Sequence, residues 1–146
     1  MKMHILLMNG PNLNILGNRD ADHYGTITLE VIEKAFQKRA NDLNIGSVSF
    51  FQANSEGDLV DFIQNNPADA IVINPGALTH YGYSLRDALE DFGKQIIEVH
   101  ISNIYAREDF RNKSVIADIA TGQISGLGLN GYLSALDFLA ENNSLE

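Results

Sequence analysis

The amino-acid sequence predicts one α/β domain, over residues 1–146, in which helices cover both faces of a parallel β-sheet. Two observations lead to this prediction. Short apolar runs alternate along the chain with segments whose apolar residues recur at helical spacing, which is typical of stacked βα units. Some of these short runs are also apolar throughout, as expected of strands that are covered on both faces.

Turn signals separate five short predicted strands. The first, Ile5 to Met8, is apolar throughout and stops at an Asn-Gly-Pro-Asn turn. The third stops in the same way at Pro75 and Gly76. The five strands are expected at residues 5–8, 47–52, 70–74, 96–101 and 123–125.

Helical patterns follow the first two strands. Apolar residues at helical spacing predict a helix over about residues 28–43. A second helix should begin at Ser55, because Asp58 stands three residues later in the pattern of a helix cap. Pro67 should end it.

Two more helices complete the pattern. Ser84 with Asp87 repeats the capping signal and predicts a helix that ends at Gly93. A closing helix is expected at about residues 132–141. Strands and helices in this order predict a flavodoxin-like three-layer sandwich with a five-stranded parallel sheet in the order 2-1-3-4-5.

Composition limits the class of protein. The residues are 45% hydrophobic and 20% charged, as in an ordinary globular domain. No apolar run approaches the roughly 18 residues of a membrane-spanning helix, and the N-terminal residues enter the first strand without a signal peptide. We therefore expect a cytoplasmic protein. Because cysteine is absent, a disulfide, a thiolate nucleophile and a thiolate metal site are excluded.

The net charge of −9 argues against nucleic-acid binding, which needs a concentrated basic surface. A small anionic substrate remains compatible with it, because a local group of arginines can hold a carboxylate inside an acidic protein.

Polar side chains gather within and after the first, third and fourth predicted strands. The carboxyl ends of parallel strands meet at one edge of the sheet, where open α/β sheets bind their ligands. These residues suit acid–base chemistry on an anionic, hydroxylated molecule, with arginines for a carboxylate, amides for hydroxyls, and His or Tyr for proton transfer. Metal catalysis is not expected, because no His-x-x-x-His or carboxylate cluster has metal-ligand spacing. The residues are Asn9, Asn12, Asn14, Arg19, Tyr24, Asn74, Thr79, His80, Glu98, His100, Ser102, Asn103, Arg107 and Arg111.

Residues 126–131, GLGLNG, fit the dinucleotide-binding pattern G-x-G-x-x-G. That fingerprint also needs an acidic residue on a further strand about 20 residues later. The sequence stops at Glu146, before such a strand. We expect these glycines to allow a tight turn and close packing of the last helix instead.

Three motifs, in order along the chain, resemble those of the type II 3-dehydroquinate dehydratases. They are NGPNLNILG at residues 9–17, NPGA at 74–77 and EVHISNI at 98–104. Arginines, aromatic residues and histidine follow at matching spacings, and the glycine pattern before the last helix recurs in that family. These further matches are Arg19, Tyr24, Thr79, His80, Arg107, Phe110, Arg111 and Tyr132.

The resemblance implies a lyase that dehydrates 3-dehydroquinate to 3-dehydroshikimate, in the shikimate pathway of aromatic amino acid biosynthesis or in the quinate pathway. It implies anti elimination through an enolate, with no metal or organic cofactor. The unrelated type I enzymes form a Schiff base on lysine instead. The five lysines of this chain agree with the type II class, because none lies at a predicted strand end where a desolvated amine would be activated.

The resemblance also assigns catalytic roles. Tyr24 matches the base that removes the C2 proton, and Arg19 the residue that supplies the positive charge such a base needs. His100 matches the acid that protonates the departing C1 hydroxyl, with Glu98 expected to orient it. Asn12 matches the residue that holds a water against the enolate oxygen.

Binding positions follow from the same resemblance. Ile101 and Ser102 are expected to offer backbone amides to the substrate carboxylate. Apart from the resemblance, Arg107 is expected to form a structural or intersubunit ion pair rather than to bind the substrate. The matched substrate-binding positions are Asn74, His80, Asp87, Ile101, Ser102 and Arg111.

The chain departs from the family pattern at three places. Asp20-Ala21 replace a common Glu-Pro, which predicts a more mobile loop. Residues 81–83, Tyr-Gly-Tyr, replace Thr or Ser pairs beside the site, and Asn112-Lys113 replace a pair that commonly contains His. None of these touches the expected acid or base.

Assembly is a further implication of the resemblance: a homododecamer built from trimers, in which Asp87 reaches the active site of the next subunit. The segment 102–113 agrees with an interface, because it mixes Ile104, Tyr105 and Phe110 with charges that a small core has little room to cover.

Two other classes could use this fold. A flavin or nucleotide carrier needs a phosphate-binding Ser/Thr/Gly loop after the first strand, where this chain has Pro11 and asparagines. A receiver-type signalling domain needs acidic residues there and an Asp ending the third strand, where Asn12 and Asn74 stand. Both fit the sequence poorly.

Overall fold

Five parallel strands form the central sheet of the computed structural model, which describes residues 2–144. Their order is β2-β1-β3-β4-β5, as predicted, and every strand lies within one residue of its expected bounds. In the register of the central pair, Leu7 of β1 lies beside Val72 of β3. The strands are β1 His4–Asn9, β2 Ser47–Gln52, β3 Ala70–Asn74, β4 Gln95–His100 and β5 Gly122–Ser125.

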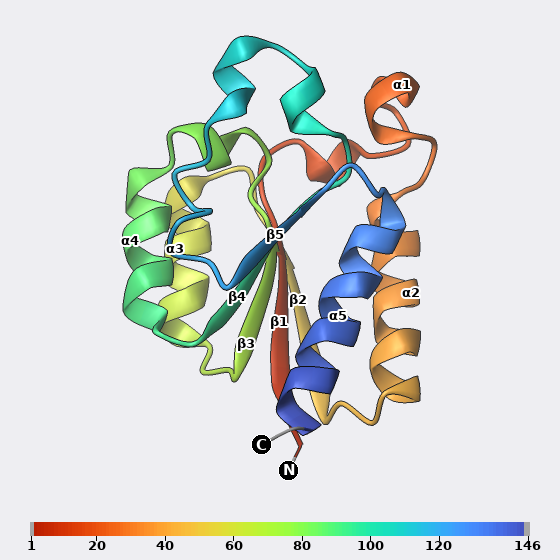
Figure 1. Cartoon of the computed structure of the whole chain (residues 1–146), viewed down its shortest axis with the longest axis vertical. Coiled ribbons are helices and arrows are strands. Elements are labelled where there is room, and N and C mark those ends of the chain that lie inside the picture. The colour runs from red at the N-terminus through yellow and green to blue at the C-terminus, as the bar shows by residue number, and fades with distance from the viewer. Residues whose placement is uncertain (1, 145–146) are drawn as a thin grey trace.

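Two helices cover each face of the sheet (Figure 1). α2 (Leu29–Asp42) and α5 (Leu129–Ser144) pack together on one face, and α3 (Glu56–Asn65) and α4 (Tyr83–Phe92) on the other. A short helix that the sequence did not predict, α1 (Ala21–Tyr24), lies beyond the carboxyl ends of the strands, at the top of Figure 1.

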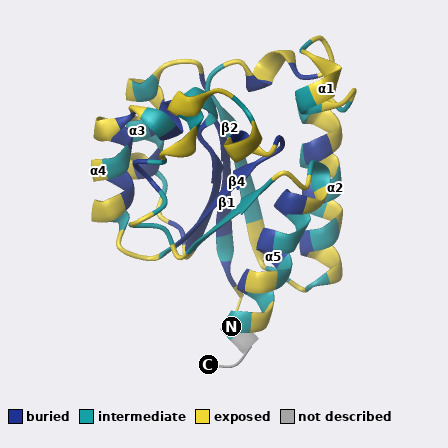
Figure 2. Cartoon of the chain, turned by 45° about the horizontal axis from the view of Figure 1, so that its top comes forward, coloured by how far each residue is buried: buried dark blue, intermediate teal, exposed yellow. Residues whose placement is uncertain are grey.

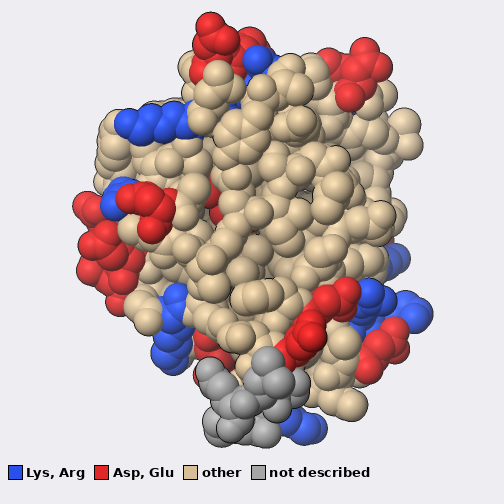
Figure 3. All heavy atoms as spheres, in the orientation of Figure 1, with Lys and Arg blue, Asp and Glu red and all other residues tan. Residues whose placement is uncertain are grey.

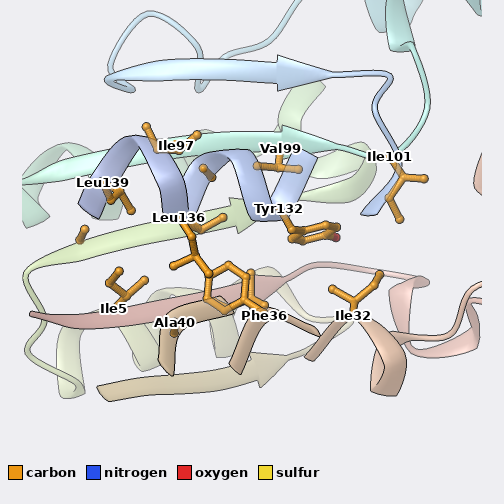
Figure 4. Close-up of a cluster of buried hydrophobic side chains, with 14 of the residues drawn as sticks. Ile5, Ile32, Phe36, Ala40, Ile97, Val99, Ile101, Tyr132, Leu136 and Leu139 are labelled. Carbon is orange, nitrogen blue, oxygen red and sulfur yellow. The ribbon is translucent and has the colours of Figure 1, made fainter. Parts of the chain in front are cut away.

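Alternate residues of β1 point into the two cores, because successive side chains of a strand face opposite sides of the sheet. Ile5 and Leu7 contact the α2–α5 layer, and Leu6 and Met8 contact the α3–α4 layer. Figure 4 shows the first core, where Phe36 of α2 and Leu136 of α5 lie beside each other on one face of the sheet. β1, β3 and β4 are therefore almost entirely buried, the edge strands β2 and β5 are partly exposed, and the helices are buried on one side (Figure 2).

Two of the predicted helix starts have different outcomes. The Ser55 hydroxyl accepts a hydrogen bond from the Asp58 amide, so the predicted cap of α3 is confirmed. The predicted cap at Ser84 is wrong, because α4 begins at Tyr83 after Gly82.

Glu56 explains this difference. Its carboxylate accepts a hydrogen bond from the Leu85 amide at 2.9 Å, so a side chain from the start of α3 caps α4. Gly82 lies so close to the Leu78 carbonyl that an added Cβ would be 2.7 Å from it. Packing of the two helices therefore sets the start of α4.

The glycines before α5 have the structural role that was predicted for them. Gly126 and Gly128 have positive φ angles of 92° and 58°, which glycine adopts without strain. Gly131 lies inside α5, and an added Cβ would be 3.3 Å from a methyl carbon of Val99. α5 begins three residues earlier than expected, at Leu129.

Charged side chains lie mostly around the rim of the face seen in Figure 3, and the centre of that face, in front of β5, is largely uncharged. Tyr105, Leu127 and Phe138 are among the exposed large hydrophobic residues of the protein. Within residues 2–144, no helix has both the length and the apolar content that crossing a membrane requires.

Candidate active site

A pocket lies at the carboxyl edge of the sheet, where the sequence predicted a site. It is formed by the segment after β1, the segment after β3 and the turns after β4. Nine of the eleven predicted site residues line it, and Glu98 and Asp87 do not. The lining residues are Pro11, Asn12, Leu13, Arg19, Tyr24, Asn74, Gly76, Ala77, His80, His100, Ile101, Ser102, Ile104, Arg107 and Arg111.

Tyr24 lies at the end of α1, whose first turn is capped by the Asp20 carboxylate. The Tyr24 hydroxyl oxygen accepts hydrogen bonds from Arg19 Nη2 at 3.0 Å and from Arg107 Nη1 at 2.9 Å. The Arg19 guanidinium also lies over the Tyr24 ring, 3.8 Å from its centroid. Two cationic donors on one oxygen stabilise negative charge there.

Arg107 therefore lines the pocket, and its predicted role in an ion pair stays a prediction beside this contact with Tyr24. Besides Tyr24 it contacts the Ser102 hydroxyl at 3.3 Å, and its nearest carboxylate, that of Glu108, is 3.8 Å away. The sequence did contain a signal, since Arg107 follows β4 within the same motif as Arg111.

His100 ends β4 and is almost fully buried. Its Nε2 lies 2.5 Å from Oε2 of Glu98, which is 0% exposed. The two side chains share one face of the sheet because they are two positions apart on a strand. Glu98 therefore makes the contact that its predicted role of orienting His100 requires.

The Glu98 carboxylate is held by donors from three further elements. It accepts hydrogen bonds from Thr79 at 2.5 Å, Ser114 at 2.8 Å and Gln123 at 3.0 Å. Burial by itself raises the pKa of Glu98, but the hydrogen bond and charge of His100, with the hydroxyl donors, outweigh it and hold that pKa below its usual value. Glu98 is therefore an ionised carboxylate in the core.

Asn74 is fixed by neighbours on both sides of its amide. Its Nδ2 donates to the Tyr132 hydroxyl at 2.9 Å, and its Oδ1 accepts from the Gly76 amide. Tyr132 in turn donates to Asn9 at 2.7 Å. Burial raises the pKa of Tyr132, so this tyrosine remains a neutral donor.

The side chains of His80 and Arg111 have defined orientations. His80 Nδ1 donates to the Lys113 carbonyl at 2.7 Å, which fixes the ring orientation. Arg111 contacts Glu108 at 3.0 Å and covers the Phe110 ring. Asn12 adopts a left-handed backbone conformation, with φ of 71°, at the turn after β1.

Asp87 is exposed on α4 and lies outside the pocket of its own chain. Ile104 was expected to contribute to an interface between subunits, but it is only 3% exposed and lines the pocket. Tyr105 and Phe110, from the same segment, are exposed. Among residues 2–144, no group of three or more His, Asp or Glu side chains is arranged to hold a metal ion.

Comparisons with known proteins agree on one family. The family model described as dehydroquinase class II matches residues 3–140. The 3-dehydroquinate dehydratase of Halothermothrix orenii is 54% identical over 135 residues, covering 91% of this chain and 90% of that protein. That of Dictyoglomus turgidum is 55% identical over 135 residues, covering 91% and 92%. The crystal structure of the type II dehydroquinase from Butyrivibrio crossotus matches with a TM-score of 0.91 and 46% identity, covering 94% of this chain and 97% of that one.

Proposed function

This chain belongs to the class II dehydroquinase family, and on that premise we propose that its pocket removes water from 3-dehydroquinate. The product is 3-dehydroshikimate, so the activity is that of a carbon–oxygen hydro-lyase in the shikimate or quinate pathway. One observation carries the proposal. In one pocket, the Tyr24 hydroxyl accepts hydrogen bonds from two guanidinium groups, and His100 contacts a buried carboxylate. Tyr24 is thus suited to act as the base of an elimination, and His100 as the acid.

Tyr24 is the proposed base. As a phenolate it takes the proton from C2, and the electrons of the broken C–H bond form an enolate with the C3 carbonyl oxygen. Arg19 and Arg107 support this role because both donate to the oxygen that must carry the negative charge. Asn12, at the turn after β1, is proposed to hold a water against the enolate oxygen.

His100 is the proposed acid. The enolate electrons form the C1–C2 double bond as the C1 hydroxyl leaves, and that hydroxyl takes a proton from His100 to depart as water. Nε2 of His100 is engaged by Glu98, so Nδ1 is the nitrogen proposed to donate. The ionised Glu98 is the negative charge that lies beside the imidazolium used in this step. Afterwards His100 regains a proton from solvent and Tyr24 loses one.

The remaining lining residues are proposed to hold the substrate. Arg111, with the backbone amides of Ile101 and Ser102, would bind the carboxylate, and Asn74 and His80 would bind hydroxyl groups. The fixed amide of Asn74 supports this assignment, because a group that is already oriented loses less entropy on binding. Each proposed step uses protein groups and water alone, so we propose catalysis without a cofactor.

We further propose that the enzyme works as a homo-oligomer, most simply a dodecamer built from trimers. In this assembly Asp87 reaches the active site of a neighbouring subunit. Asp87 is exposed on α4 and does not line the pocket of its own chain. Tyr83, also on α4, is 64% exposed, and an interface over α4 would cover its ring.

The direct test of the activity is to mix the purified protein with 3-dehydroquinate and follow the ultraviolet absorbance of the conjugated enone product. The proposal predicts a steady rise with wild-type protein and almost none with a His100→Ala variant. If the wild-type protein leaves the substrate unchanged, the proposed activity is wrong.

A further inference from the structure

Strand β5, at the edge of the sheet, contributes a side chain to the acid end of the site although it does not line the pocket. Gln123 of β5 donates from Nε2 to Oε2 of Glu98 at 3.0 Å. The same carboxylate oxygen contacts His100 Nε2 at 2.5 Å. Gln123 is therefore two hydrogen bonds away from the proposed acid, with Glu98 between them.

The orientation of the Gln123 amide is itself fixed by a second residue. Tyr105, in the turn Ile104–Ala106 after β4, donates its hydroxyl proton to Gln123 Oε1 at 2.5 Å. A carboxylate only accepts hydrogen bonds, so Gln123 must turn its NH₂ group toward Glu98. The flipped amide would place its oxygen against the carboxylate and lose the bond from Tyr105. The chain Tyr105–Gln123–Glu98–His100 thus has one consistent set of donors and acceptors.

We propose that Gln123 and Tyr105 are positioning residues for the acid step of the reaction, acting on His100 through Glu98. The inference rests on the proposed dehydratase activity. Neither residue lines the pocket, so neither is expected to touch the substrate. Their effect is to keep Oε2 of Glu98 in place, which orients the imidazole ring toward the leaving hydroxyl.

Burial differs among the four residues of this hydrogen-bonded series, and that difference makes the inference testable. Glu98 is fully buried, Gln123 is partly buried, and Tyr105 is 47% exposed at the surface. Substitution at Tyr105 therefore removes a hydroxyl group from the surface without opening the core. Hydrogen bonds to charged groups are stronger than those between neutral groups. Loss of the Gln123 donor should therefore disturb the position of the Glu98 carboxylate.

The variants are Gln123→Met, which keeps the length of the side chain and removes its hydrogen bonds, and Tyr105→Phe. We expect kcat to fall roughly 10-fold in the first and about 3-fold in the second, with KM nearly unchanged. In the double variant, kcat should equal that of Gln123→Met alone, because Tyr105 acts only through Gln123. The control is Gln37→Met, which removes an exposed amide bond to Asn41 on α2 and should leave kcat unchanged.

A second readout separates positioning from a general structural effect. In D₂O, proton removal at C2 is measured as deuterium incorporation into 3-dehydroquinate, independently of water loss. Gln123→Met should slow elimination more than exchange, so the ratio of exchange to elimination rises. A general loss of folded protein would lower both equally.

Three results would overturn the inference: wild-type kcat in both variants, additive losses in the double variant, or equal losses of exchange and elimination. If Gln123→Met does not fold, Tyr105→Phe alone decides, because an unchanged exchange-to-elimination ratio there refutes the role. These outcomes differ from failure of the proposed function, in which the wild-type protein itself would not convert the substrate.

Discussion

The hydroxyl oxygen of Tyr24 lies 2.9 Å from Nη1 of Arg107, although the two residues are 83 positions apart in the sequence. Tyr24 comes from α1, beyond β1, and Arg107 from the turns beyond β4. The strand order brings these two segments together at one edge of the sheet. The topology of the fold therefore places a guanidinium group on the proposed base.

Substitution of Arg107 should weaken catalysis more than folding. Arg107→Met removes a cationic donor from the Tyr24 oxygen, and loss of such a donor costs on the order of 10²-fold in kcat. Steady-state kinetics measure this loss, and denaturant unfolding measures stability. Arg39→Met is the matched control, because Arg39 binds Asp137 between α2 and α5. Wild-type kcat in Arg107→Met would favour a structural role for this arginine over a role at Tyr24.

Acid should destabilise the fold through Glu98. The pKa of Glu98 lies below its usual value in the folded protein, so the ionised carboxylate stabilises the fold above the unfolded pKa of about 4.3. That stabilisation is lost as the pH falls through the folded pKa. The free energy of unfolding, measured in urea between about pH 3 and pH 6, should therefore decrease at the acid end for wild type and change less for Glu98→Gln. An identical pH dependence in the two proteins would contradict this role.

Catalysis should need neither a metal nor an imine. Activity is expected to survive prolonged dialysis against a chelator, because the proposed steps use Tyr24, His100 and water. Borohydride added with substrate should leave the enzyme active, because no lysine forms a Schiff base. A borohydride-trapped adduct on any lysine, found by mass spectrometry, would rule out the proposed route.

Assembly should be necessary for full activity. Light scattering is expected to give a homo-oligomer, most simply a dodecamer, and Asp87→Ala should lower activity without altering the pocket of its own chain. Asp61→Ala on α3 offers a control for loss of another helical carboxylate on the same face of the sheet. A fully active monomer would show that each chain has a complete site.

The strands and their order could be predicted from the sequence because the signals are local. The apolar runs of β1 and β3 are followed directly by turn residues, and the helices carry apolar residues at helical spacing. The start of α4 could not be predicted, because its cap is Glu56 of another helix. A contact between distant elements leaves no trace in a local pattern.

The same distinction holds for the site. Its edge location and nine of its lining residues were predicted, since the motifs after β1, β3 and β4 carry them. The contact of Arg107 with Tyr24 and the donors Ser114 and Gln123 around Glu98 were missed. These are pairings of side chains from separate segments, and only the folded chain places them within hydrogen-bond distance.

The central claim is that Tyr24 removes the C2 proton and His100 releases the C1 hydroxyl. Nuclear magnetic resonance of 3-dehydroquinate in D₂O tests both halves together, by comparing deuterium incorporation at C2 with formation of product. We predict that Tyr24→Phe loses both, and that His100→Ala loses elimination by about 10²–10⁴-fold while it retains most of the exchange. Exchange at the wild-type rate in Tyr24→Phe, or its complete loss in a folded His100→Ala, would contradict the claim.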